Sequence, residues 1–131
     1  MLLILFNILF PLDFIRFKKN ITSLLNTTNI IKFNDVIVVG TSGGAFIYDY
    51  LSETKLNFSD DLNTLNVSSL QVCPNGYLWI GSENYNGINI FDDNFNLYSN
   101  IQYPQFNKIL NIAFTDKYAF AVVSLNNNIM L

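Results

Sequence analysis

Residues 75–82 read NGYLWIGS, and residues 87–92 read GINIFD. An Asn-Gly pair between apolar runs is a strong signal for a β-hairpin, so Asn75-Gly76 is expected to form a two-residue type I′ turn. Short apolar runs bounded by turn residues predict β-strands rather than helices. Working outward from the turn, four strands are expected, at residues 67–72, 78–82, 88–91 and 97–101.

The same pattern recurs along the chain. Residues 30–49, IIKFNDVIVVGTSGGAFIYD, form an upstream copy in which Gly40 precedes Gly81 by 41 positions. A weaker third copy covers residues 109–124, ILNIAFTDKYAFAVVS, and there Ser124 takes the place of Gly81. Self-similarity at a fixed period of this size indicates an array of like structural units.

Four short antiparallel strands in each 40 to 45 residues are typical of a β-propeller blade. The expected fold class is therefore all-β, an incomplete β-propeller of three four-stranded antiparallel blades. The blades are placed at about residues 28–59, 67–103 and 107–131. The second strands are apolar on both faces, which suits a strand sandwiched between neighbouring blades. Trp79 is accordingly expected to pack between two blades.

The copies resemble the two-component-regulator propeller repeat, whose pattern runs D-G-x-L-W-I-G-T-x-x-G-G-L-x-x-Y-D. Asn75 replaces the first Asp, Ser82 replaces the Thr, and the turn at residues 83–87 is one residue longer. The upstream copy keeps G-T-x-G-G at residues 40–44. The positions that carry the motif, interpreted as structural, are Gly40, Gly43, Gly44, Asn75, Gly76, Trp79, Gly81, Gly87 and Asp92.

This resemblance implies a role in binding rather than catalysis. Residues 14–24 are similar to an outer strand that completes the last blade, as in the amino-terminal propeller of the protein that partners the sortase of the type IX secretion system. A scaffold for protein–protein interaction in that system is the first function implied. The alternative is a periplasmic ligand-sensing propeller of a two-component sensor kinase. A propeller lyase or glycosidase is a third, less favoured, hypothesis.

Residues 1–12, MLLILFNILFPL, form a separate apolar segment. It is shorter than the roughly 20 residues of a transmembrane helix, and its length fits the apolar core of a signal peptide. No Lys or Arg precedes it, and no small-x-small cleavage site follows it. An export signal is favoured, with a buried first strand or helix as the alternative. The expected location is therefore periplasmic, cell-surface or secreted.

Composition excludes several classes of protein. The chain of 131 residues is 50% hydrophobic, has a net charge of −3, contains one Cys and lacks His. These values exclude a disordered chain, a disulfide framework and any His-based triad. Without a basic footprint, nucleic-acid binding is not expected. Asn accounts for 20 residues, which favours many tight turns.

Three copies are fewer than the four to eight blades that close a propeller. The sequence is therefore expected to be a fragment of a longer protein, with further blades and any kinase, sorting or anchoring domain after Leu131. Contact with a membrane is expected only through the amino-terminal segment or through such domains.

Binding residues are expected in the loops that follow the second strands. The candidate ligand-facing residues are Ser42, Glu83, Asn84, Tyr85 and Asn86. Tyr85 and its amide neighbours suit a protein or a carbohydrate ligand, whereas the alternative is an exposed turn without a ligand.

No catalytic residue, metal site or cofactor is predicted. The acidic pairs Asp60-Asp61 and Asp92-Asp93 lack the spacing of a calcium loop and are interpreted as turn residues. Glu53 and Glu83 offer no identifiable acid pair for glycoside chemistry. Cys73 has no histidine to activate it and is expected to be a small buried apolar residue.

Overall fold

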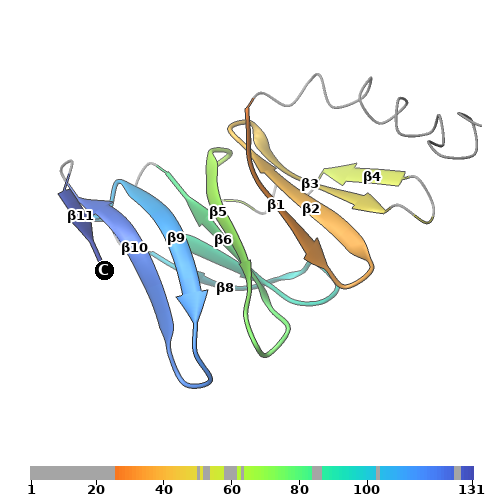
Figure 1. Ribbon diagram of the computed structural model, residues 1–131. Coiled ribbons are helices and arrows are strands. Elements are labelled where there is room, and N and C mark those ends of the chain that lie inside the picture. Colours follow the sequence, from red (N-terminus) through yellow and green to blue (C-terminus); the bar gives the residue numbers. More distant parts are fainter. Residues whose placement is uncertain are drawn as a thin grey trace, which may run out of the picture.

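The computed structural model describes residues 26–49, 51, 54–57, 62, 64–83, 87–102, 104–125 and 128–131. These residues form three antiparallel sheets that follow one another across the molecule (Figure 1). The predicted all-β class and incomplete propeller-like arrangement are confirmed. Within the described ranges, no helix is long and apolar enough to cross a lipid bilayer.

Each sheet is formed by strands that are consecutive in the chain. The first sheet has the order β1 (Thr27–Phe33), β2 (Val36–Thr41), β3 (Gly44–Asp49) and β4 (Thr54–Asn57). The second has the order β5 (Val67–Val72), β6 (Leu78–Ser82), β7 (Ile88–Phe91) and β8 (Leu97–Ile101). The third has the order β9 (Lys108–Phe114), β10 (Ala119–Leu125) and β11 (Asn128–Met130). The four strands predicted around Asn75-Gly76 are thereby confirmed.

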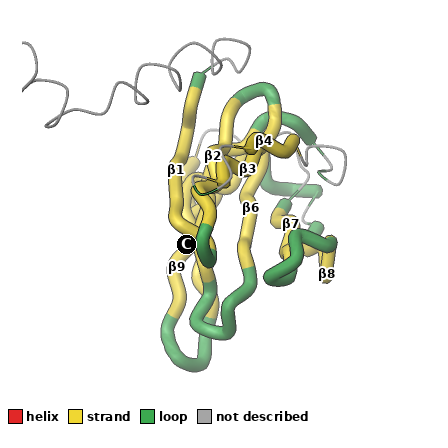
Figure 2. The backbone as a smooth tube through the Cα atoms, turned by 90° about the vertical axis from the view of Figure 1, so that its right-hand side faces the viewer, coloured by secondary structure: helices red, strands yellow, loops and turns green. Residues whose placement is uncertain are grey.

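The first strands of the three sheets, β1, β5 and β9, contact one another in that order. Figure 2 shows strands of different sheets running along a common direction, so that their turns gather at two opposite ends. This arrangement of consecutive sheets, each packed face to face on the next, is that of propeller blades.

Two apolar cores hold the sheets together. The core between the first and second sheets contains fully buried Phe33, Val38, Leu78, Ile80 and Phe91. The core between the second and third sheets contains the following buried residues: Ile88, Ile90, Ile109, Ile112 and Val123. Burying one such side chain contributes about 1.5–3 kcal/mol, so these cores are the main stabilising contacts between the sheets.

Trp79 belongs to the second of these cores, as predicted. Its ring packs edge-on against Phe114 of the third sheet, with ring centroids 5.0 Å apart and an interplanar angle of 81°. An edge-to-face pair of this kind adds to the stabilisation that comes from burial alone.

A β-bulge recurs in the first strand of every sheet. The register shifts leave one extra residue in β1, β5 and β9, namely Thr28, Ser68 and Leu110. Aligned on these bulges, Gly40 and Gly81 correspond to Val122. The sequence alignment that placed Ser124 at this position was wrong, because the weak third copy offers no glycine to fix the spacing.

The turn at Asn75-Gly76 also differs from the prediction. Only Gly76 has positive φ (81°), and its N–H donates to the carbonyl oxygen of Cys73 at 2.9 Å. This is a type I turn centred on Pro74-Asn75 with a left-handed glycine after it. Proline fixes φ near −65°, which places Pro74 at the first central position and excludes the type I′ geometry there.

Several sequence predictions lie outside the described residues. They are the apolar segment 1–12, the outer strand 14–24, Glu53, Asp60, Asp61, Asn84, Tyr85 and Asn86. Cys73 is described and is half-buried, so the expectation of a buried residue was wrong in degree. It directly follows the last residue of β5 and precedes Pro74, at the start of the turn.

Candidate functional site

Gly40 and Gly81 let neighbouring sheets approach closely. A Cβ atom at Gly40 would lie 2.5 Å from a methyl of Val67, and one at Gly81 would lie 2.8 Å from a methyl of Ile109. Val67 and Ile109 occupy equivalent places in β5 and β9, so the two contacts are the same contact repeated. These glycines serve sheet packing, and they touch no candidate ligand surface.

The hydroxyl residues after the two glycines brace the next loop. Thr41 donates its hydroxyl hydrogen bond to the carbonyl oxygen of Gly44 at 2.8 Å, and Gly43 N–H donates to the same hydroxyl at 3.1 Å. Ser82 donates in the same way to the carbonyl oxygen of Gly87 at 3.3 Å. Both hydroxyl residues are buried, so each bond satisfies a polar group that water does not reach.

In the first two sheets an Asp at the end of the third strand caps the following turn: Asp49 is the last residue of β3, and Asp92 directly follows β7. A carboxylate oxygen of Asp49 accepts from the N–H of Leu51 at 2.9 Å, and one of Asp92 accepts from the N–H of Asn94 at 2.9 Å. A carboxylate that accepts from the backbone two residues later forms an Asx turn. The interpretation of Asp92 as a turn residue thus has a direct physical explanation.

Glu83, one of the predicted ligand-facing residues, makes contacts within the protein. It forms an ion pair with Lys108 of β9 and accepts a hydrogen bond from the side-chain amide of Asn66. Its N–H also donates to the carbonyl oxygen of Asn66 at 3.1 Å. Glu83 therefore joins the second sheet to the third. Sequence reasoning missed Lys108 and Asn66 because they are distant in the chain and belong to no motif.

Ser42 and Glu83 occupy equivalent places in the first and second sheets. Ser42 directly follows β2, and Glu83 directly follows β6. The Ser42 N–H donates to the carbonyl oxygen of Asn26 at 3.2 Å, and Glu83 makes the equivalent bond to Asn66. The two loops thus start identically and face the same end of the molecule. The tip of the second loop, residues 84–86, is outside the described residues, so the predicted ligand contact there remains a prediction.

At the opposite end of the strands, the turns line an open polar pocket of about 350 Å³. We call it the turn pocket; its lining residues are Asn34, Asn75, Gly76, Tyr77, Asp92 and Asp93. They come from the β1–β2, β5–β6 and β7–β8 turns, hence from two neighbouring sheets. The side-chain amide of Asn34 donates to the carbonyl oxygen of Asp93 at 3.4 Å and ties the two sheets together across the pocket.

The carboxylate of Asp92 accepts hydrogen bonds from groups of its own turn. It accepts from the backbone N–H of Asn96 at 2.8 Å and from the Asn96 side-chain amide at 3.1 Å. The side-chain bond and the backbone bond from Asn96 hold the pKa of Asp92 below its ordinary value. Asp92 therefore stays ionised and fixed in place at neutral pH, and its role in the pocket is to shape the turn.

The other groups in the turn pocket offer hydrogen bonds. Asn34, Asn75 and Asp93 are exposed, whereas Tyr77 is half-buried, with its ring 4.7 Å from the ring of Tyr98 and packed against the core between the second and third sheets. Among the described residues, no cluster of three or more Cys, Asp or Glu is placed to hold a metal ion. An amide both donates and accepts and a carboxylate accepts, so the pocket suits a neutral ligand rich in hydroxyl groups.

The sequence signals for this pocket were present but were interpreted differently. Asn75, Gly76 and Asp92 were recognised as turn residues of the repeat, whereas Asn34 and Tyr77 were not selected. Turns that close separate hairpins lie side by side only when the sheets stack, so the pocket follows from the blade packing. A single hairpin sequence does not reveal it.

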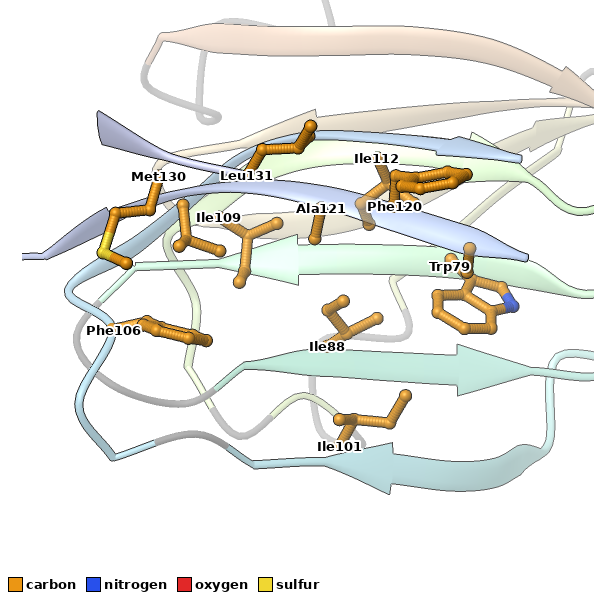
Figure 3. Close-up of a pocket in the computed structure, with 12 residues that line it drawn as sticks. Trp79, Ile88, Ile101, Phe106, Ile109, Ile112, Phe120, Ala121, Met130 and Leu131 are labelled. Carbon is orange, nitrogen blue, oxygen red and sulfur yellow. The ribbon is translucent and has the colours of Figure 1, made fainter. Parts of the chain in front are cut away.

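A second cavity, which is apolar and measures about 370 Å³, lies between the second and third sheets (Figure 3). In this view Trp79, Ile88 and Ile101 line one side, and Ala121 and Ile109 line the other. Its lining side chains are apolar, so it offers a surface for packing.

No protein-family model matches the chain, and no curated protein matches it. Among solved structures, the chain is similar to the extracellular domain of a protein described as a hybrid two-component system of B. thetaiotaomicron. The TM-score is 0.61 at 20% sequence identity, and the match covers 75% of this chain and 14% of that one. At this identity the likeness establishes the fold, and it agrees with a two-component-regulator-like propeller. Membership of the repeat family remains a prediction.

Proposed function

We propose that this chain is part of an extracytoplasmic β-propeller that binds a carbohydrate in the turn pocket without catalysing a reaction. The observation that carries the proposal is the pocket itself. It is concave, it spans two sheets, and it presents amide and carboxylate groups together. A few convergent polar groups in a concave site are the usual means of orienting a small ligand.

The solved relative supports an extracellular β-domain, and it favours neither the sensor hypothesis nor the secretion scaffold. That relative is described as the extracellular domain of a hybrid two-component system. No observation in the structure bears on type IX secretion, which stays a prediction from the sequence resemblance. Because the matched chain is about seven times longer than the aligned part, any signalling activity belongs to a larger protein.

The state of the acidic residues supports a non-enzymatic role. Glycosidases need two carboxyl groups that act from opposite sides of a bond. In the turn pocket, Asp92 and Asp93 are adjacent in one turn, and the Asp92 carboxylate is occupied by the N–H groups of Asn94 and Asn96. A binding site requires only that such groups be fixed in place.

The proposal is tested by isothermal titration of the whole chain with a panel of neutral and acidic oligosaccharides. Asn34→Gly removes the amide and still accepts the positive φ of 51° at this position. Asn75→Ala removes a second amide of the pocket, at a position that does not have positive φ. Loss of one hydrogen bond to the ligand in either variant is expected to weaken binding about tenfold.

The matched control is Ser42→Ala, at the opposite end of the strands. We expect it to bind the same oligosaccharide as the unchanged chain does. If Ser42→Ala or Glu83→Gln abolishes binding while Asn34→Gly leaves it intact, the ligand binds at the loops predicted from the sequence and the turn pocket is excluded.

Extracytoplasmic location is tested separately, by fusing residues 1–25 to alkaline phosphatase, which is active only after export. Export predicts phosphatase activity that is lost when Leu3 and Ile4 are both replaced by Asp. An active fusion that tolerates both charges would contradict a signal-peptide role for the apolar segment.

A further inference from the structure

The turn between β5 and β6, which lines the turn pocket, has a left-handed residue in its fourth place. The Gly76 N–H donates to the Cys73 carbonyl oxygen, and the Cys73 N–H donates to the Tyr77 carbonyl oxygen, each at 2.9 Å. These two bonds close the turn, and within it Gly76 has a φ of 81°. Glycine suits this conformation because it has no Cβ atom to crowd the backbone.

The turn between β7 and β8, which also lines the pocket, has the same hydrogen bonds but carries phenylalanine in the fourth place. The Phe95 N–H donates to the Asp92 carbonyl oxygen at 3.1 Å, and the Asp92 N–H donates to the Asn96 carbonyl oxygen at 3.0 Å. Phe95 has a φ of 62°. A bulky side chain in the left-handed region strains the backbone, so a contact elsewhere must offset the cost.

That contact is made with the first sheet. The ring of Phe95 packs edge-on against Phe33 of β1, with ring centroids 5.3 Å apart and an interplanar angle of 76°. Phe33 is fully buried, and Phe95 packs against the core between the first and second sheets. An edge-to-face pair and the burial that accompanies it stabilise this docked position of the turn. At Gly76, by contrast, an added Cβ atom would meet nothing within 4 Å, so no adjacent contact would offset the same strain.

A polar contact joins the β1–β2 and β7–β8 turns beside the two rings. Asn34 directly follows Phe33, has a φ of 51°, and donates its side-chain amide to the Asp93 carbonyl oxygen at 3.4 Å. The ring pair and the amide contact therefore link the same two turns. Asn34 and Asp93 both line the turn pocket, whereas Phe95 lies behind the turn and does not line it.

We infer that Phe95 is the positioning residue of the turn pocket. Its ring, docked on Phe33, holds the β7–β8 turn against the first sheet and so places Asp93 beside Asn34. Phe95 acts through the turn and touches no ligand itself. For what the pocket binds, this role rests on the proposed function, but docking of the turn is measurable without a ligand.

The variant Phe95→Gly tests this role by NMR on the whole chain. Glycine accepts the φ of 62° without strain, so the turn should keep its shape while it loses the ring. We expect loss of the nuclear Overhauser contacts between the Asn34 side-chain amide and Asp93. The pKa of Asp92 should stay below its ordinary value, because the side-chain and backbone donors of Asn96 belong to the same turn.

Two matched controls separate the ring from the turn. Phe95→Tyr keeps an aromatic ring in the same place and is expected to keep the contacts between Asn34 and Asp93. Asn94→Ala changes a neighbouring residue of the same turn and leaves the ring and the backbone bond to Asp92 in place, so it should keep them too. Loss of the contacts in either control would overturn the proposal.

Two results for Phe95→Gly would also overturn it. If the contacts between Asn34 and Asp93 persist, the ring does not position the turn. If the pKa of Asp92 rises to its ordinary value, the ring is needed to form the turn rather than to dock it.

The effect on binding is measured with the oligosaccharide that binds in the titration described above. Phe95→Gly should weaken this binding at least about tenfold although it removes no group that lines the pocket, because the binding-competent arrangement would be only partly populated. Unchanged affinity would contradict the positioning role. If no oligosaccharide binds to the unchanged chain, the proposed function fails, and the NMR contacts still decide the role of Phe95.

Discussion

Ser68 is joined to Ile109 across the boundary between the second and third sheets, where its hydroxyl donates a 2.6 Å hydrogen bond to the Ile109 carbonyl oxygen. Thr28 makes the equivalent bond to Val67 between the first and second sheets, at 2.9 Å. Both donors are the extra residues of the β-bulges. A bulge leaves one residue out of the hydrogen-bonded ladder. Here the hydroxyl of that residue bonds to the next sheet and so connects consecutive sheets.

Replacing Ser68 by Ala should destabilise the chain by about 1 kcal/mol, because the part-buried Ile109 carbonyl loses its side-chain donor. Ser99→Ala on the exposed face of β8 is the matched control and should change stability by less than about 0.5 kcal/mol. Urea unfolding followed by circular dichroism measures both. Equal effects of the two substitutions would mean that the bond between the sheets contributes nothing specific.

Gly81→Ala should be more damaging. The added methyl would lie 2.2 Å from the Ser69 hydroxyl oxygen and 2.8 Å from a methyl of Ile109, so the sheets must separate. Overpacking of this kind costs about 1–3 kcal/mol. Gly43→Ala meets only one atom, 3.8 Å away, and should be close to neutral. A neutral Gly81→Ala in the same unfolding assay would contradict the close approach of β6 and β9.

The positions of the strands could be predicted from the sequence because alternating apolar runs and turn residues act locally. The packing of Trp79 was also predictable, since a strand that is apolar on both faces must be covered on both. What the sequence did not reveal was contact between segments about 40 residues apart. The bonds of Ser68 to Ile109 and of Asn34 to Asp93 depend on how the sheets stack, and no local pattern encodes that.

The third copy shows the same limit. Leu110 and Val122 stand where the other sheets have a hydroxyl residue and a glycine, so this copy has no motif residue on which to align it. Pairing with β9 fixed the register instead, because Ala121 and Val123 must face the second sheet. Similarly, the preference of Pro74 for negative φ overrode the Asn-Gly signal, which is why the turn type was wrong.

Trp79→Ala should destabilise the chain by about 2 kcal/mol, which is less than the 3–5 kcal/mol of a fully buried tryptophan because this one is half-buried. Trp79→Phe keeps an aromatic contact with Phe114 and should cost about half as much. Circular dichroism is the suitable measurement, since either substitution removes the fluorescent residue. If Trp79→Phe is as harmful as Trp79→Ala, the edge-on ring contact is not what stabilises this core.

Asp92 should make stability depend on pH in the acid range. Its pKa is lower in the folded chain than in the unfolded chain, chiefly because of the side-chain and backbone donors of Asn96. The stabilisation is therefore complete above the ordinary Asp value of about 3.9 and is lost as pH falls through the lower, folded value. Asp92→Asn should flatten the dependence in this window. Carboxyl titration by NMR checks the direction, and an Asp92 pKa above the ordinary value would contradict the turn geometry.

The stacking of consecutive sheets through their glycines is the central claim, and nuclear Overhauser contacts measure it most directly. We expect strong contacts from the α-protons of Gly40 to a methyl of Val67, and from those of Gly81 to a methyl of Ile109. Both pairs must be seen in one sample of the whole chain. If both are absent while the ladders within each sheet are intact, the sheets form but do not stack as propeller blades.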